Sequence, residues 1–245
     1  MTPARNLLFG RAVAISADAL TIAVASPTEA LGGVVTLFKG PARVPDGQVR
    51  GANTLEDDHF GASLALSGDG LLLAAGAPTE STLAVGVNPA ATTVTASASG
   101  AVYLLRRGAS GWAQEAFVKA TNTHDGDVFG TSVALSADGA VLAVGAPGED
   151  SESRGIEGNQ STLLAADSGA VFLYRGQGGV WVRSAYVKAS NADAADVFGT
   201  SVALSSNGAR LVATSPGDDS SANGLDGDAT NNDAAESGAC FVFDE

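Results

Sequence analysis

Short runs of alternating small polar and branched apolar residues, separated by tight turns, recur along this chain. Residues 132–136 (SVALS) alternate in this way, residues 137–139 (ADG) supply a turn, and residues 141–146 (VLAVGA) form an apolar return. A period of two on both sides of a tight turn predicts a β-hairpin. Residues 170–174 (AVFLY) and 181–188 (WVRSAYVK) predict two further strands joined by a glycine-rich turn. The pattern therefore indicates a four-stranded antiparallel unit, whose strands we call A to D.

The unit occurs four times. Residues 127–136 (DVFGTSVALS) return unchanged as residues 196–205, 69 positions further on. Self-similarity at a fixed period is the signature of a repeat architecture. Each copy opens with a Phe-Gly pair, at residues 9–10, 60–61, 129–130 and 198–199. We expect one domain, residues 1–245, with copies that span approximately residues 7–57, 58–126, 127–195 and 196–245.

Four strands per repeat without helical periodicity are typical of a β-propeller blade. The predicted fold is all-β, a propeller-type array of four blades with four antiparallel strands each. The Phe-Gly aromatic is expected to fill the gap between neighbouring blades. Trp112 and Trp181 begin the outermost strand D and are expected to pack at the periphery. Cys240, in the last strand C, is expected to be a small buried residue.

The fourth copy stops directly after its strand C, so the last blade is expected to lack its outer strand D. A bare strand edge invites pairing with another chain. We expect this chain to be a homo-oligomer or part of a larger propeller. The edge would be satisfied by an eight-blade ring of two chains, by strand donation along a filament, or by the remaining blades of a longer propeller.

Residues 129–174 carry the pattern FG-x-SVALS, AVGAP and SGAV. This pattern resembles the FG-GAP repeat of the integrin α-subunit propeller and of many bacterial surface proteins, and the resemblance extends over nearly the whole chain. It implies an extracellular or cell-surface propeller, usually of seven blades, that binds ligands or mediates adhesion, often with bound calcium. The calcium loop of that family, Asp-x-Asp-x-Asp-Gly between strands A and B, is replaced here by residues 137–139 (ADG). The ligands of that family are therefore not carried over to these turns.

Charge narrows the range of partners. The chain has 27 acidic and 13 basic residues, a net charge of −14. Such a surface repels phosphate backbones and anionic lipids, so nucleic-acid and membrane-surface binding are disfavoured. No apolar run approaches the ~20 residues of a membrane helix. Residues 7–25, which resemble a secretory signal, are read as part of the first repeat, so no signal peptide is visible. We expect a protein or surface ligand.

The B–C and D–A loops of a blade lie on one face, and acidic residues concentrate in the B–C loops of copies 3 and 4. Oxygen-rich loops with glycines at their bends suit Ca²⁺, which takes 6 to 8 oxygen ligands. The alternative is a solvated acidic loop held by Asx turns. The candidate metal ligands are Glu149, Asp150, Glu157 and Asn159 in copy 3, and Asp219, Asn223, Asp226, Asp228, Asn231 and Asp233 in copy 4.

Catalytic motifs are absent from the sequence. It contains no Gly-x-Ser-x-Gly, His-Glu-x-x-His or phosphate-loop sequence. His59 and His124 fall at non-equivalent positions of their repeats. We therefore predict a non-enzymatic recognition or adhesion module. The alternatives are a structural subunit that assembles into a ring or filament by pairing strands between chains, and an enzyme with its site at the propeller axis.

Overall fold

The computed structural model describes residues 8–90, 92–224, 227 and 229–244. Within these residues the regular elements are β-strands, and the strands form four antiparallel sheets. No helix in this part of the chain is long and apolar enough to cross a membrane.

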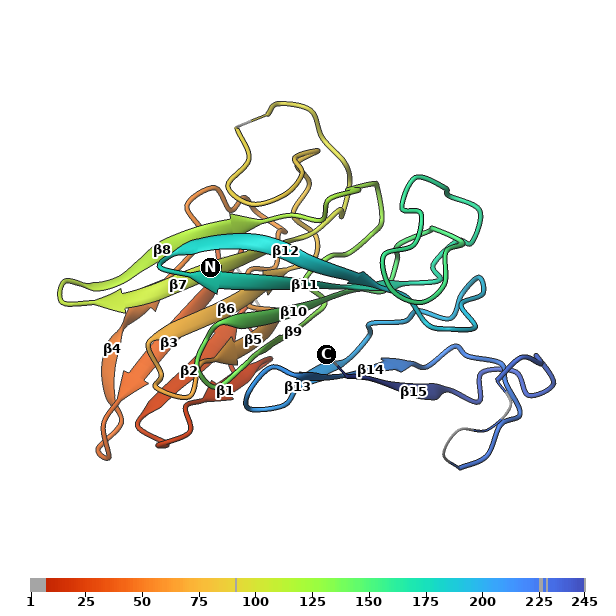
Figure 1. Cartoon of the computed structure of the whole chain (residues 1–245). Helices are drawn as coiled ribbons and strands as arrows, with labels where there is room; N and C mark the ends of the chain where they lie inside the picture. Colours follow the sequence, from red (N-terminus) through yellow and green to blue (C-terminus); the bar gives the residue numbers. More distant parts are fainter. Residues whose placement is uncertain (1–7, 91, 225–226, 228, 245) are drawn as a thin grey trace.

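Each copy of the repeat folds into one sheet, whose strands follow each other in sequence order (Figure 1). Blade 1 contains β1 (Val13–Ile15), β2 (Thr21–Ser26), β3 (Val34–Lys39) and β4 (Val44–Val49). Blade 2 contains β5 (Ser63–Leu66), β6 (Leu72–Ala77), β7 (Ala101–Gly108) and β8 (Gly111–Val118). Blade 3 contains β9 (Ser132–Leu135), β10 (Val141–Ala146), β11 (Ala170–Gln177) and β12 (Val180–Val187). Blade 4 contains β13 (Val202–Leu204), β14 (Arg210–Ser215) and β15 (Ala239–Asp244).

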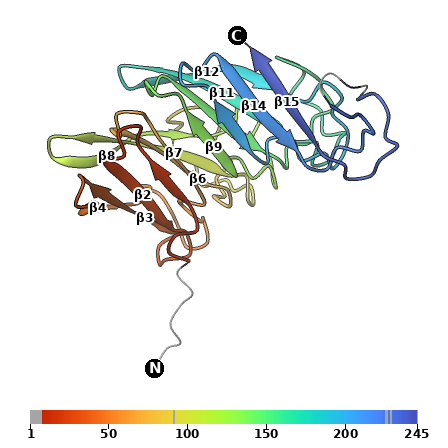
Figure 2. The same cartoon turned by 90° about the horizontal axis from the view of Figure 1, so that it is seen from below.

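The predicted array of four blades, the last without its outer strand, is confirmed. Figure 2 shows the sheets fanned side by side from β2–β4 to β14–β15. The first strands of successive blades contact each other, β1 with β5, β5 with β9, and β9 with β13. Strand A is therefore the innermost strand of each blade and strand D the outermost.

The A–B turns are closed by their own side chains. In blade 3 the Ser136 hydroxyl donates to Asp138 Oδ1 over 2.6 Å, and the Ala140 N–H donates to the same oxygen over 2.9 Å. Gly139 adopts a φ of 68°, which glycine reaches without strain. The two hydrogen bonds hold the pKa of Asp138 below its usual value. Asp138 therefore stabilises the A–B turn. The calcium loop of the family that this repeat resembles is found at the same position.

The Phe-Gly aromatics fill the spaces between blades, as predicted, in copies 2 to 4. The Phe129 ring is fully buried and meets Phe172 edge-on, with ring centroids 5.5 Å apart. Its N–H donates to the Ser99 carbonyl of blade 2 over 3.1 Å. Gly100 leaves room for this approach, because a Cβ there would lie 2.1 Å from the Phe129 carbonyl oxygen. Phe9, the equivalent residue of blade 1, is 62% exposed.

The expected peripheral position of the strand D tryptophans is wrong for Trp181. Its side chain is only 4% exposed and belongs to a buried cluster with Leu104, Ala116 and Leu142, between blades 2 and 3. The indole N–H donates to Glu115 Oε1 over 2.9 Å. The outer strand β12 is therefore also covered by a neighbour, because blades 2 and 3 pack against each other from their inner to their outer strands.

The expected burial of Cys240 is wrong as well. Its equivalent in blade 3, Val171, is fully buried because blade 4 covers that face of β11. Cys240 lies on the corresponding face of β15 and is exposed, as is Val242. Among the described residues, nothing stacks on this face of blade 4.

Candidate functional site

The B–C loops of blades 3 and 4, residues 147–169 and 216–238, extend from the same end of the array as the connections between blades (Figure 1). They contain the candidate ligands named above. Their geometry depends on what fixes the two ends of each loop to its blade.

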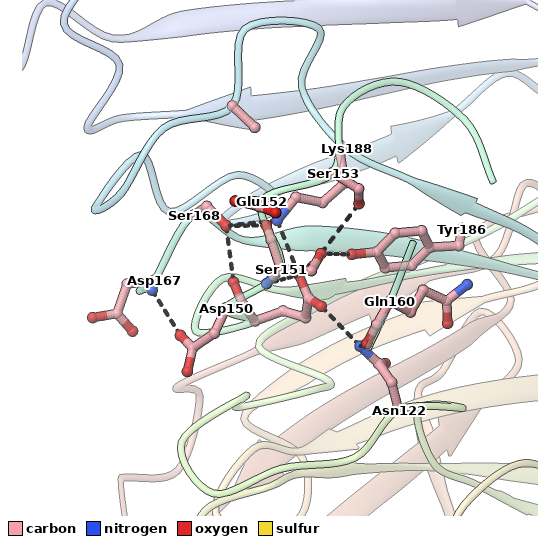
Figure 3. A network of polar contacts seen from close by, with 12 residues as sticks. Asn122, Asp150, Ser151, Glu152, Ser153, Gln160, Asp167, Ser168, Tyr186 and Lys188 are labelled. Carbon is pink, nitrogen blue, oxygen red and sulfur yellow. Dashed lines mark hydrogen bonds and ion pairs between the residues drawn. The ribbon is translucent and has the colours of Figure 1, made fainter. Parts of the chain in front are cut away.

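A buried ion pair fixes the ends of the blade 3 loop (Figure 3). Lys188 follows β12, and its Nζ lies 2.9 Å from Glu149 Oε2 and 2.6 Å from Ser168 Oγ. All three side chains are buried. Glu149 stands near the start of the loop and Ser168 at its end. Lys188 therefore ties both ends of the loop to the outer strand of the same blade.

Further hydrogen bonds complete the environment of the Glu149 carboxylate. Asn122, from the connection between blades 2 and 3, donates to Glu149 Oε1 over 2.8 Å. The Ser151 N–H donates to Oε2 over 3.2 Å, and the Ser151 hydroxyl bonds to the Tyr186 hydroxyl. Burial lowers the pKa of Lys188, and the attraction of Glu149 opposes that shift. The loop base is thus a hydrogen-bonded ionic cluster in which each charge has a partner.

An equivalent carboxylate occurs in each of the other blades, paired with lysine in blade 2, with arginine in blade 1 and with no described cation in blade 4. In blade 2, Lys119 Nζ lies 2.7 Å from Glu80 Oε2, and both side chains are buried. Arg50 and Glu29 form the corresponding pair in blade 1, over 3.1 Å. In blade 4 the equivalent carboxylate belongs to Asp218, which is fully buried but has no lysine or arginine partner among the described residues.

Lys119 and Lys188 occupy equivalent positions of their repeats, 69 residues apart, but the sequence analysis above predicts no role for them. The signal was present, because Glu80 and Glu149 recur at the same spacing of 69. A lysine and a glutamate that repeat together in otherwise apolar surroundings indicate a buried pair, since isolated charges are rarely buried.

The candidate ligands of copy 3 already have partners within the protein. Glu149 is paired with Lys188, as described above. Glu157 forms an ion pair with Arg183 over 2.7 Å and accepts the Tyr186 N–H. The other two accept backbone N–H groups, Asp150 from Asp167 over 2.8 Å and Asn159 from Ser161 over 3.1 Å. The structure does not bring these four residues to one point; they close turns and pair charges along the loop.

In copy 4 the candidate side chains likewise support loop turns. Asp219 Oδ1 accepts the Glu236 N–H over 2.6 Å, and Asn223 donates to the Ser221 carbonyl over 3.2 Å. Asn231 Oδ1 accepts N–H groups from Ser221, over 3.0 Å, and from Asp233, over 3.3 Å. Asp226 and Asp228 lie outside the described residues. In the part of the chain that the structure describes, no group of three or more His, Cys, Asp or Glu residues is placed to hold a metal ion. Calcium binding stays a prediction.

A second buried carboxylate repeats beside the loops. Asp127 is 1% exposed, and its Oδ2 accepts the His124 N–H over 2.7 Å. Its Oδ1 is buried without a hydrogen-bond partner among the described residues. Burial, with repulsion from Glu149, raises the pKa of Asp127 to about 8. The equivalent Asp58 has a pKa raised to about 6 by burial.

We expect Asp127→Asn to flatten the dependence of stability on pH. An unfolded aspartate titrates near pH 4, so between about pH 4 and 8 the native protein holds a proton that the unfolded chain has released. The free energy of unfolding of the parent protein therefore falls as pH rises through this window. Asparagine keeps an oxygen acceptor for the His124 N–H and does not titrate.

Melting temperatures measured from pH 5 to 8.5 test this expectation. The parent protein should lose more stability over the range than Asp127→Asn, and a variant of the exposed neighbour, Asp125→Asn, should follow the parent. Coincident profiles for the parent and Asp127→Asn would show that Asp127 titrates normally in the native state.

Comparison with known proteins identifies the repeat. Residues 112–174 match the family model of the FG-GAP repeat, which confirms the resemblance over this segment. The search of curated proteins found no match. A solved chain of Kuenenia stuttgartiensis hydrazine synthase is similar over 82% of this chain and 54% of that one, with 14% identity and a TM-score of 0.46. The present chain thus spans about half the length of that solved chain, and no activity is carried over from it. The chain is a propeller-like module that contains an FG-GAP repeat.

Proposed function

We propose that this chain is a non-enzymatic recognition module, acting outside the cell or at its surface, whose ligand engages the B–C loops of blades 3 and 4. The observation that carries the proposal is the buried cluster of Lys188, Glu149 and Ser168, which ties both ends of a long loop to a rigid sheet. Loops held in this way lose less conformational entropy on binding. The FG-GAP repeat supports the extracellular setting and the recognition role.

The exposed side chains of these loops include several carboxylates, which favour a ligand with positive charge. Glu152 and Asp167 are exposed in blade 3, and Asp233 and Glu236 are exposed in blade 4. With a net charge of −14, the chain favours a cationic ligand. Calcium ions are the simplest such ligand, because they are coordinated by oxygen atoms of the kind that these loops supply. In this proposal calcium screens the loop acids and joins them to a protein or surface ligand.

Calcium is expected to stabilise the chain. At a concentration 100-fold above its Kd, a ligand that binds only the folded state adds about 2.7 kcal/mol to the free energy of unfolding. Thermal melting in EGTA and in CaCl₂ should therefore differ, and titration calorimetry with CaCl₂ should give a binding isotherm. The double variant Asp226→Ala with Asp228→Ala should lose the stabilisation. Asp57→Asn, which removes an exposed charge far from these loops in the sequence, should retain it.

Two results would contradict the proposal. Identical melting curves in EGTA and CaCl₂ would remove calcium from it. Hydrolytic turnover by the purified chain, or absorbance from a bound cofactor, would favour an enzyme.

A further inference from the structure

A pocket lies between the B–C loop of blade 2 and the outer strand β8 of the same blade. Its volume is about 260 Å³. Thr82, Ala84 and Pro89 line it from the loop, Phe117 lines it from β8, and Asn53 lines it from the connection between blades 1 and 2. None of the described residues that line it is charged. A concave, mostly apolar pocket with a few polar groups is the usual form of a small-molecule site.

The hydrogen bonds that hold the loop to the outer strand are the same in blades 2 and 3. The Asn88 N–H donates to the Phe117 carbonyl over 2.7 Å, and the equivalent Glu157 N–H donates to the Tyr186 carbonyl over 2.8 Å. The Asn88 side chain accepts the Phe117 N–H over 2.8 Å, as the Glu157 side chain accepts the Tyr186 N–H. The pocket wall is therefore fixed to β8 without a ligand, and the two blades differ here in their side chains.

Three hydroxyl groups form a network at the equivalent place in blade 3 (Figure 3). The Tyr186 hydroxyl bonds to the Ser151 hydroxyl, which also bonds to the Ser153 hydroxyl over 3.2 Å. The residues 69 positions earlier are Phe117, Thr82 and Ala84. Blade 2 therefore keeps one of the three hydroxyl groups and has apolar side chains in place of the other two.

The remaining hydroxyl, that of Thr82, has lost its partners. Its oxygen is buried and makes no hydrogen bond to any described residue. A buried polar group without a partner is costly to the folded state, so such a group in a native protein needs an explanation. Because Thr82 lines the pocket, a ligand in the pocket can supply the missing hydrogen bond.

A row of aromatic rings leads from the interior to the pocket. Phe60 and Tyr103 are fully buried and meet edge-on, with ring centroids 5.3 Å apart. Tyr103 in turn packs against Phe117, with ring centroids 5.1 Å apart. Phe117 is only partly buried, and it is the member of the row that lines the pocket. A further ring in the pocket would extend this row in the offset or edge-on geometries that aromatic pairs favour.

We propose that this pocket binds a small neutral phenol, with its ring against Phe117 and its hydroxyl on Thr82 Oγ1. The apolar walls favour the ring, and the unpartnered Thr82 hydroxyl favours a ligand that can hydrogen-bond to it. A charged ligand is disfavoured, because burial of a charge without a counter-charge is costly. The bound phenol would restore in blade 2 the contact that the Tyr186 hydroxyl makes with Ser151 in blade 3. This inference goes beyond the proposed function, because it concerns a different loop and needs no calcium.

The test titrates 4-methylphenol into the full chain, labelled for NMR, in neutral buffer that contains EGTA. The amide signals of Thr82 and Phe117 should shift in a saturable way, with a Kd on the order of 1 mM for a ligand of this size. Toluene has the same ring without the hydroxyl and should bind about fivefold more weakly, the effect of one lost hydrogen bond. The charged analogue 4-methylbenzoate should bind at least as weakly as toluene.

Two variants test the role of the hydroxyl. Thr82→Val should bind 4-methylphenol and toluene equally, because only the parent protein distinguishes the two through this group. It should not lower the melting temperature, since the Thr82 hydroxyl has no partner among the described residues. Thr95→Val, the same change across the β-bridge from Thr82, is the matched control and should bind both ligands as the parent does. Phe117→Tyr should place a hydroxyl beside Thr82, as in blade 3, and should raise the melting temperature while it weakens binding of 4-methylphenol.

Three outcomes would overturn the inference. The first is the absence of saturable shifts at Thr82 and Phe117 with 4-methylphenol. The second is equal affinity of the parent protein for 4-methylphenol and toluene, or for 4-methylphenol and 4-methylbenzoate, since the pocket would then not recognise a neutral hydroxyl. The third is a lower melting temperature of Thr82→Val than of Thr95→Val, since the Thr82 hydroxyl would then have a partner within the protein.

Discussion

Lys188→Met is expected to lower the free energy of unfolding by about 3 to 5 kcal/mol, the range measured when one partner of a buried ion pair is removed. The lysine is fully buried, so its removal leaves the Glu149 carboxylate without a counter-charge in a site that water does not reach. The same change also releases Ser168, and with it the end of the B–C loop. Urea denaturation followed by circular dichroism measures the effect.

Two further variants isolate the cause. Adding Glu149→Gln to Lys188→Met should recover much of the lost stability, because glutamine still accepts from Asn122 and carries no charge. Arg183→Met removes the partly exposed pair with Glu157 and should cost no more than about 1 kcal/mol. If Lys188→Met costs no more than Arg183→Met, the buried pair does not stabilise the loop base.

Phe129→Ala is expected to cost about 3 to 5 kcal/mol, as truncation of a buried aromatic residue does. The ring is fully enclosed between blades 2 and 3 and contacts Phe172 and Tyr174 edge-on. Trp181→Ala is expected to lower the free energy of unfolding by a similar amount, because the indole is buried at the same interface. The sequence alone predicts a smaller cost for the tryptophan, as a residue of the outer strand, and the structure corrects that prediction.

Phe9→Ala is the matched control within the same chain. It is the same change at the equivalent position of blade 1, but its ring is mostly exposed. The expected cost is within about 0.5 kcal/mol. Equal costs for Phe9→Ala and Phe129→Ala in urea denaturation would contradict the placement of the Phe-Gly aromatics between blades.

The sequence by itself determined the repeat, the hairpins and the order of strands. These features are local or periodic. Ser136, Asp138 and Gly139 close a turn through contacts within six residues, and alternation on either side specifies which face of each strand is apolar. The same local interactions then recur in each copy, at a spacing of 51 residues between the first two copies and 69 between the later ones. For this reason the four-bladed array and the missing outer strand of the last blade were predictable.

The candidate site was predictable only in part. The sequence located the acidic B–C loops, but the described candidate residues turned out to close turns or to pair with Lys188 and Arg183. Composition cannot distinguish a carboxylate that awaits a metal ion from one that a lysine neutralises. That distinction depends on which distant strand passes the loop base, and Glu149 and Lys188 are 39 positions apart.

Only the tertiary structure decided which side chains are covered. Phe9 and Phe129 occupy the same place in their repeats, yet one is mostly exposed and the other enclosed. Val171 and Cys240 differ in the same way. Glu149 and Asp218 are both buried, but within the described residues only Glu149 has a cation beside it. The physical reason is the same in each case: burial and charge pairing in a stacked array are properties of the interface between neighbouring strands and blades. The sequence of one repeat does not determine whether another strand or blade packs against it.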